Sequence, residues 1–187
     1  YAGGVYISTD GAASWQPDNA GLDQPFVQSL WLDPANPAVL FAGSDLGLFK
    51  SLDAGANWQT ANQGLTNTSI LALAVSPAAP DTLYAGTYFG GVFRSTDGGQ
   101  SWQAANRGLA NPDVSSMAIV PTAPDTFYAG TLSNGIYKST DGGASWNTAN
   151  AGLSNLQVHA VQLDPTNPAV LYAATEGGMY KSANSAG

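Results

Sequence analysis

Cysteine is absent from this 187-residue chain, which excludes disulfide bonds and thiolate metal sites. Positive charge is scarce: Lys and Arg total 5 against 13 Asp and Glu, and the formal net charge is −8. Nucleic-acid binding needs clustered Lys and Arg to displace counterions from phosphates, so we expect no nucleic-acid partner. No apolar run approaches the roughly 18 residues of a membrane-spanning helix, so we expect no membrane insertion.

Charged residues of either sign are few, at 10% of the chain, while 44% of the residues are hydrophobic. This balance is typical of a folded chain and not of a disordered one. The chain starts at Tyr1 without Met and shows no signal peptide or lipidation motif, so we expect a mature or trimmed product. Gly, Ser, Thr and Asn are abundant beside little Lys or Glu, which favours an extracellular or cell-surface location.

What the chain does contain is an internal repeat. Tryptophans recur at intervals of 43, 44 and 44 residues, and each follows an Asp by five positions. A degraded copy ends the chain, with Asn184 in the place of the Asp and no Trp after it. The repeated pairs are Asp10 and Trp15, Asp53 and Trp58, Asp97 and Trp102, and Asp141 and Trp146.

Each repeat contains four short runs of β-branched and aromatic residues separated by turns rich in Pro and Gly. In one repeat these runs are residues 70–75, 82–85, 91–94 and 102–104. No segment of ten or more residues shows helical periodicity with caps. A period of about 44 residues with four strands matches a propeller blade. The sequence therefore predicts an all-β protein, a β-propeller of four-stranded blades.

The pattern Ser-x-Asp-x-Gly-x-x-Trp, found at 95–102 and 139–146, resembles the Asp-box, also called the BNR repeat. The copy at 51–58 has Ala54 where the glycine is expected, and Gly55 follows. Such boxes occur in sialidases, xyloglucan-cleaving hydrolases, sortilin-type receptors and photosystem II assembly factors. The resemblance implies a β-propeller, and because fold does not imply function it leaves several functional classes open.

The chemistry of the box is structural. An Asp beside a tight turn accepts backbone N–H groups, and the following glycine adopts positive φ at little cost. The Trp starts the outermost strand, and we expect it to pack between its own blade and the neighbouring one. A calcium site is a poor alternative because no Asp-x-Asp-x-Asp loop accompanies the turns. We predict no metal site and no cofactor.

The repeats divide a single domain, 1–187, into blades. We expect full blades at 27–69, 70–113 and 114–156, with partial blades at 1–26 and 157–187, or about four blades. The two partial blades could combine to close a four-bladed ring. Both of them contain the third strand of a blade, however, so one of these two strands would be redundant. That redundancy favours a larger ring, formed by further blades of a longer chain or by self-association of copies.

Residues that differ between repeats are free to specialise, and the turns between second and third strands differ from one repeat to the next. Tyr88 and Phe89 could stack on sugar rings or anchor a protein, or could pack against the adjacent blade. Asp45 and Glu176 could form a carboxylate pair, although single loop acids are usually just solvated. The candidate ligand-binding residues are Trp31, Asp45, Leu46, Tyr88, Phe89, Asn134 and Glu176.

Two further residues stand out on the innermost strands. Trp31 occupies a position where the aligned residues are Ala74, Ala118 and Gln162. It could line a central channel as a ligand platform, but filling space in the core is the favoured interpretation. His159 is the only histidine, and without Cys or clustered acids it makes a poor metal site, so we interpret it as structural.

The sequence offers few residues that could carry catalysis. By resemblance, sialidase-like chemistry would need three arginines, and only Arg94 and Arg107 are present. A xyloglucanase-like mechanism would need two acids flanking a cleft. We therefore favour a non-catalytic extracellular module that binds a glycan or a protein, or a structural scaffold. The alternative is a fragment of a xyloglucanase-like glycoside hydrolase propeller. Acids outside the boxes and the Pro-rich turns are Asp18, Asp23, Asp45, Asp113 and Glu176.

Overall fold

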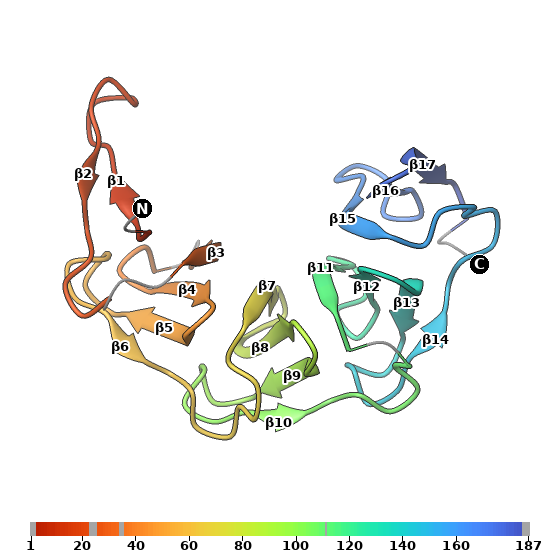
Figure 1. Cartoon of the computed structure of the whole chain (residues 1–187), viewed down its shortest axis with the longest axis horizontal. Coiled ribbons are helices and arrows are strands. Elements are labelled where there is room, and N and C mark those ends of the chain that lie inside the picture. Colours follow the sequence, from red (N-terminus) through yellow and green to blue (C-terminus); the bar gives the residue numbers. More distant parts are fainter. Residues whose placement is uncertain (1–2, 23–25, 34–35, 111, 185–187) are drawn as a thin grey trace.

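A computed structural model describes residues 3–22, 26–33, 36–110 and 112–184. All regular elements in these ranges are β-strands, which confirms the all-β prediction. They form five antiparallel sheets that follow one another along an open arc (Figure 1). The described chain contains no helix with the length and hydropathy needed to cross a membrane.

The three central sheets each contain four strands, and every strand pairs with its neighbour in sequence. The first strand of each sheet lies on the inside of the arc, and the short fourth strand lies on the outside (Figure 1). The second sheet comprises β3 (Val27–Leu32), β4 (Leu40–Ser44), β5 (Gly47–Ser51) and β6 (Gln59–Thr60). The third comprises β7 (Ile70–Ser76), β8 (Ala79–Thr87), β9 (Gly91–Ser95) and β10 (Gln103–Ala104). The fourth comprises β11 (Val114–Ile119), β12 (Phe127–Thr131), β13 (Gly135–Ser139) and β14 (Asn147–Thr148).

The two end sheets are smaller. The first sheet consists of β1 (Tyr6–Ile7) and β2 (Gln16–Pro17), and the fifth of β15 (Val158–Leu163), β16 (Leu171–Thr175) and β17 (Gly178–Ser182). They stand at opposite ends of the arc and share no strand pairing (Figure 1). The composite blade that would close a four-bladed ring is therefore not formed in this structure.

Apolar side chains pack between neighbouring sheets and not at one common centre. One cluster, for example, joins Phe41 and Leu48 of the second sheet to Ile70, Leu83 and Trp102 of the third. The innermost strands β3, β7, β11 and β15 also contact one another in sequence order. Each sheet is thus held mainly by the sheets beside it.

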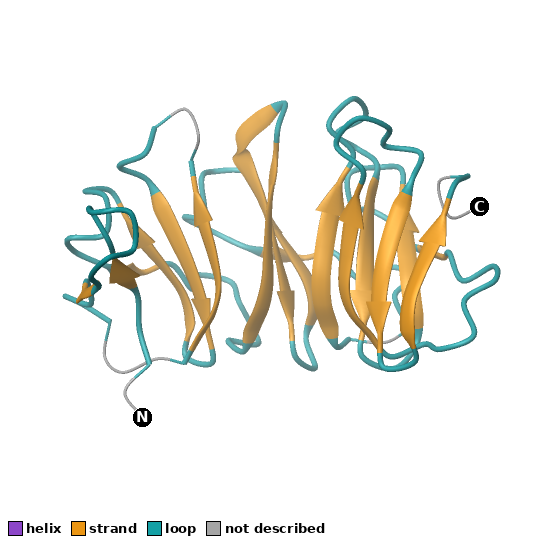
Figure 2. Ribbon diagram, turned by 90° about the horizontal axis from the view of Figure 1, so that it is seen from above, coloured by secondary structure: helices purple, strands orange, loops and turns teal. Residues whose placement is uncertain are grey.

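The strands run between two opposite faces, where the turns lie (Figure 2). Because the strands alternate in direction, the turns between second and third strands gather on one face, which we name the loop face. The turns between third and fourth strands contain the Asp-boxes and gather on the other, which we name the box face. The candidate ligand-binding turns and the boxes therefore point away from each other.

Candidate functional site

The Asp-box turns are closed by their own polar groups. The Ser95 hydroxyl donates to Asp97 Oδ1 at 2.7 Å, the Ser101 amide donates to the same oxygen at 2.9 Å, and the Gly99 amide donates to Ser95 Oγ at 2.9 Å. Hydrogen bonds, first of all from the Ser101 side chain, lower the pKa of Asp97 to about 2. The carboxylate is thus ionised and committed to the turn.

The same turn forms where the glycine is replaced. Ala54 adopts φ 61°, close to the 68° of Gly98 at the matching position. A left-handed conformation is uncommon for a residue with a Cβ. The carboxylate of Asp53 is nonetheless bonded like the others, accepting from Ser51 Oγ at 2.8 Å and from the Asn57 amide at 2.8 Å. The hydrogen bonds of the box therefore hold Ala54 in a backbone conformation that alanine normally disfavours.

Three box tryptophans are buried between sheets: Trp58, Trp102 and Trp146 are each 3% exposed. Each reaches back to the preceding sheet; Trp102, for example, donates its indole N–H to the Ala61 carbonyl at 3.0 Å. Trp15 is 59% exposed, so the expectation that all four box tryptophans pack between blades is wrong for this one. The reason is that the described chain places no sheet on the side to which Trp15 would turn.

A second repeated contact escaped the sequence reasoning. In each of the last four sheets a cation on the third strand lies over an aromatic ring of the second strand, at 5.1 to 6.0 Å from the ring centroid. The signal was available, because the cations align between repeats. The pairs are Lys50 with Phe41, Arg94 with Tyr84, Lys138 with Tyr128, and Lys181 with Tyr172.

On the loop face, the turn between β8 and β9 presents two aromatic rings. Tyr88 and Phe89 lie with ring centroids 3.9 Å apart and are 40% and 63% exposed. Phe89 has φ 66°, a conformation that is strained for a bulky side chain. Its amide donates to Asp113 Oδ1 at 2.9 Å, and the Tyr88 amide donates to the Ser69 carbonyl at 2.9 Å. The pair is therefore held in place by the backbone beneath it while its rings stay largely in solvent.

The acids of the loop face make local contacts. Asp45 accepts from the Phe26 amide at 2.7 Å, and Glu176 lies 3.1 Å from His159 Nε2. His159 falls at a register irregularity of β15, between Val158 and Ala160. Because His159 and Glu176 are both exposed, the interpretation of the histidine as a structural residue gains no support from packing.

The remaining candidates differ in exposure. Leu46 is exposed beside Asp45, and Asn134 is half-buried in the turn between β12 and β13. Trp31 is half-buried, 5.9 Å from the Phe41 ring, and packs against the cluster that contains Trp102. These are packing contacts, of the kind expected if Trp31 fills space between sheets.

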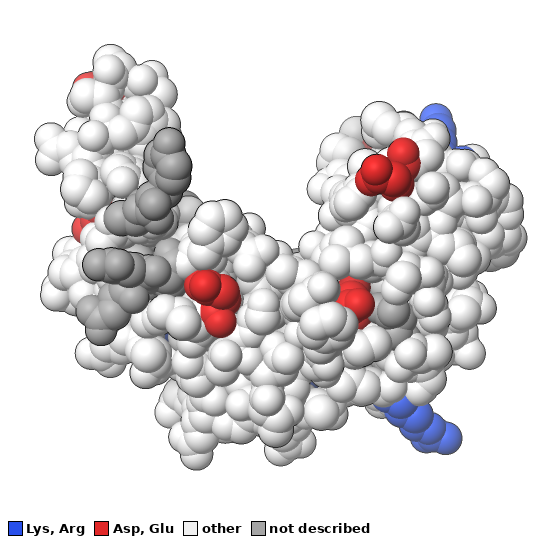
Figure 3. Space-filling view, in the orientation of Figure 1, with Lys and Arg blue, Asp and Glu red and all other residues white. Residues whose placement is uncertain are grey.

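The structure does not gather the candidate residues into one concave site. Four cavities of the described chain are lined by residues of other segments. In Figure 3 the Asp and Glu atoms of the visible face form separate groups. No group of three or more His, Asp or Glu with metal-binding geometry occurs among the described residues, and Asp23 lies outside them. The candidate residues of the loop face are therefore separate side chains, and Tyr88 and Phe89 form the largest exposed apolar group among them.

Radial four-stranded sheets, boxes on one face and variable turns on the other define the class of protein as an Asp-box repeat β-propeller. The chain belongs to the Sortilin-Vps10 family (Sortilin, neurotensin receptor 3), whose model matches residues 90–186. The family match and the similar structures confirm both the Asp-box resemblance and the propeller fold. No curated protein matches the chain.

Several solved structures share this architecture. An ancestral GH74 enzyme is 28% identical over 91% of the chain with a TM-score of 0.75, and the GH74 enzyme of Niastella koreensis is 24% identical over 96% with 0.77. The extracellular domain of BT4673, a putative hybrid two-component system of B. thetaiotaomicron, is 16% identical over 97% with 0.76. The chain spans only 24%, 32% and 25% of these three structures.

Proposed function

We propose that the chain is a non-catalytic propeller module that binds a neutral glycan at its loop face, outside the cell. The observation that carries the proposal is the Tyr88–Phe89 pair, which exposes two rings on a turn fixed by hydrogen bonds. Aromatic faces stack on the apolar faces of sugar rings, and a rigid pair loses little conformational entropy on binding.

The charge distribution favours a neutral glycan over a charged one. The chain carries a net charge of −8, and Asp45, Asp113 and Glu176 lie in or beside the turns of the loop face. Four of the five cations lie over aromatic rings of their own sheets. An anionic polysaccharide would meet repulsion, whereas the hydroxyl groups of a neutral one donate hydrogen bonds to these carboxylates without a charge penalty.

Two further observations support this proposal. The boxes resemble those of xyloglucan-cleaving hydrolases, and the similarity to an ancestral GH74 enzyme reaches 28% identity. The extracellular location rests on the composition, which is rich in Gly and poor in Lys and Arg.

The test is binding of neutral oligosaccharides, first on a glycan array and then by calorimetry. A variant with Tyr88→Ala and Phe89→Ala should bind at least about 30-fold more weakly, since one aromatic hot spot contributes about 2 kcal/mol. Leu52→Ala is the matched control. The Leu52 side chain is 66% exposed, close to the 63% of Phe89, but Leu52 belongs to an Asp-box on the opposite face. Loss of binding in the control alone would move the site to the box face, and absence of any glycan ligand would contradict the proposal.

The second candidate is a fragment of a glycoside hydrolase propeller, which the GH74 similarity favours. In that case the exposed His159–Glu176 pair would be the first group to examine for a role in proton transfer. Reducing-sugar release from xyloglucan by the wild-type chain, lost in Glu176→Gln, would replace the binding proposal with the hydrolase.

A further inference from the structure

Both arginines of the chain line one cavity of about 250 Å³ between the third and fourth sheets, which we name the arginine cavity. Arg94 belongs to β9, and Arg107 follows β10, the outermost strand of the third sheet (Figure 1). The boxes of both sheets complete the walls, and no Asp or Glu of the described chain is among the lining residues. The polar lining residues besides the arginines are Thr96, Ser101, Gln103 and Asn106.

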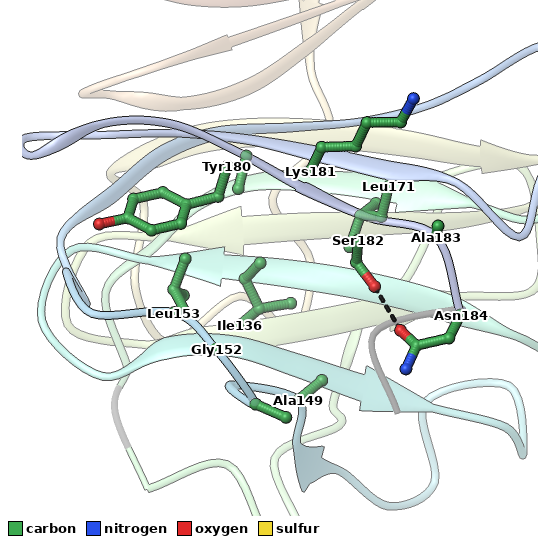
Figure 4. A pocket seen from close by; sticks show the side chains of 12 residues that line it. Ile136, Ala149, Gly152, Leu153, Leu171, Tyr180, Lys181, Ser182, Ala183 and Asn184 are labelled. Atoms are coloured by element: carbon green, nitrogen blue, oxygen red, sulfur yellow. Dashed lines mark hydrogen bonds between the residues drawn. The ribbon is translucent and has the colours of Figure 1, made fainter.

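The arginine cavity has a counterpart one repeat earlier, between the second and third sheets. Each residue that lines this counterpart lies 44 positions before a residue that lines the arginine cavity. Both arginines are replaced there, Arg94 by Lys50 and Arg107 by Gln63. The cavity bordered by the fifth sheet has Ala151 at the position of Arg107 (Figure 4). A second cation is therefore found at one junction of sheets and is not part of the repeated pattern.

The bonding of the first cation also differs between the two cavities. Lys50 donates to the Gly98 carbonyl of the next box at 2.7 Å. At the matching turn, the Gly142 carbonyl accepts from the Tyr84 hydroxyl at 3.1 Å. The residue at the position of Tyr84 in the second sheet is Phe41, which has no hydroxyl. The tyrosine hydroxyl therefore occupies the acceptor that the cation binds one repeat earlier.

Arg94 consequently keeps an unused hydrogen-bond donor. Its Nε is buried, and no hydrogen-bond partner for this atom occurs among the described residues. The guanidinium lies 6.0 Å from the centroid of the Tyr84 ring, and an arginine stacked on an aromatic face still offers its in-plane N–H groups. An unpaired buried donor is costly, and a bound water, ion or ligand is one way to satisfy it.

The carboxylates nearest to the cavity limit the charge of a ligand. Asp97 accepts from the Ser101 hydroxyl, and Asp141 accepts from the Ser145 hydroxyl in the neighbouring box. Hydrogen bonds lower the pKa of both carboxyl groups, so both are ionised at neutral pH. A doubly charged phosphate would meet their repulsion. A single carboxylate meets less of it and still fits the fork of N–H groups that arginine presents.

The remaining lining suits hydroxyl groups. Thr96 and Gln103 line the cavity beside the arginines, and both are exposed. A threonine hydroxyl and a glutamine amide can each donate and accept hydrogen bonds. Sites for drug-sized ligands measure about 300–1,000 Å³, so a cavity of about 250 Å³ suits a smaller molecule.

We propose that the arginine cavity binds a small hydroxylated carboxylic acid. Its carboxylate lies between Arg94 and Arg107, and its hydroxyl groups contact Thr96 and Gln103. This site is separate from the loop face, and it does not depend on the binding of a glycan there.

The probe is D-gluconate, a monocarboxylate with several hydroxyl groups, titrated into the isotope-labelled chain and followed by NMR. We expect saturable shifts at the amides of Arg107, Gly143 and Ala144. Sorbitol differs from gluconate in carrying a CH₂OH group in place of the carboxylate. It should bind at least about tenfold more weakly, equivalent to about 1.4 kcal/mol. Acetate, which lacks the hydroxyl groups, and inorganic phosphate should both bind more weakly than gluconate.

Arg107→Gln is the decisive variant, because it introduces the residue that holds this position one repeat earlier. Its affinity for gluconate should fall at least about tenfold. Lys181→Gln is the matched control: it removes the same charge from another sheet and should leave the affinity unchanged. Tyr84→Phe should weaken binding at least about threefold, because Arg94 can then donate to the Gly142 carbonyl as Lys50 does to Gly98. Melting curves verify that each variant folds.

Three results would overturn the proposal: no saturable binding of gluconate, equal binding of sorbitol, or equal gluconate affinity of wild-type and Arg107→Gln chains. Tighter binding of inorganic phosphate would overturn the choice of a carboxylate, and equal binding of acetate would overturn the choice of a hydroxylated ligand. The variant with Tyr88→Ala and Phe89→Ala should bind gluconate as the wild type does, whatever its affinity for glycans. A loss of gluconate binding in that variant would place the acid on the loop face.

Discussion

The boxes at 8–15 and 95–102 have the same turn and different tryptophan environments. In the first, Asp10 accepts from the Ser8 hydroxyl at 2.8 Å and from the Ser14 amide at 2.9 Å, which matches the bonding of Asp97. The pKa of Asp10 is lowered to about 2, as it is for Asp97. Yet Trp15 is exposed and Trp102 is buried. The turn is therefore local chemistry, whereas the burial of the Trp depends on a neighbouring sheet.

The largest difference between the two boxes should come from removing the ring. Trp102→Ala should lower the free energy of unfolding by about 3–5 kcal/mol, because it empties a buried site. Trp15→Ala should change it by less than about 0.5 kcal/mol, as for other exposed positions. Urea unfolding of the two variants measures this. Equal effects would mean that Trp15 is packed in solution.

Gly108, which lies against the Trp146 backbone, and Gly152, which holds the matching position 44 residues later, offer a second comparison. Gly108→Ala and Gly152→Ala share a positive φ, of 84° and 78°, which should cost about 1 kcal/mol in each. At Gly108 the new Cβ also meets the Trp146 carbonyl, which should add about 1–3 kcal/mol of overpacking. Equal melting temperatures for the two variants would contradict this expectation, because they would show that the fourth sheet shifts to make room for the new Cβ at Gly108.

A smaller effect is expected at the cations. Lys50 lies over Phe41 and also donates to the Gly98 carbonyl of the next sheet at 2.7 Å, whereas Lys181 lies over Tyr172. Lys50→Met should destabilise the chain by about 1–2 kcal/mol and Lys181→Met by about 0.5 kcal/mol. Chemical denaturation distinguishes them, and a larger loss for Lys181→Met would contradict the link between sheets.

The smallest effect should be the acid sensitivity of one box. The pKa of Asp97 is depressed, so its contribution to stability is complete above the ordinary aspartate pKa of 3.8 and lost as the pH falls towards about 2. Wild-type protein should therefore lose more stability between pH about 4 and about 2 than Asp97→Asn does. Unfolding midpoints across this range provide the measurement, and parallel curves would show that the carboxylate contributes nothing.

Sequence reasoning succeeded where the repeat itself carries the information. The register places Trp31 opposite Phe41 and Ala74 opposite Tyr84, as the alignment of repeats required. It failed for Trp15, since a repeated pattern assumes that each copy has the same neighbours. It also could not foresee φ 66° at Phe89, which depends on an acceptor 24 residues away at Asp113. The sequence therefore predicted the local motifs, but it did not predict contacts between segments that lie far apart along the chain.

The placement of the apolar core between sheets has a consequence for cooperativity. A molecule held together junction by junction behaves as a one-dimensional array, in which stability is a sum over nearest-neighbour terms. The third sheet has a four-stranded neighbour on each side, and the fourth lies between the four-stranded third sheet and the three-stranded fifth. Within the described residues the first and fifth sheets have one neighbouring sheet each. Amide hydrogen exchange should accordingly be slowest in β7 and β11 and faster in the strands of the first and fifth sheets.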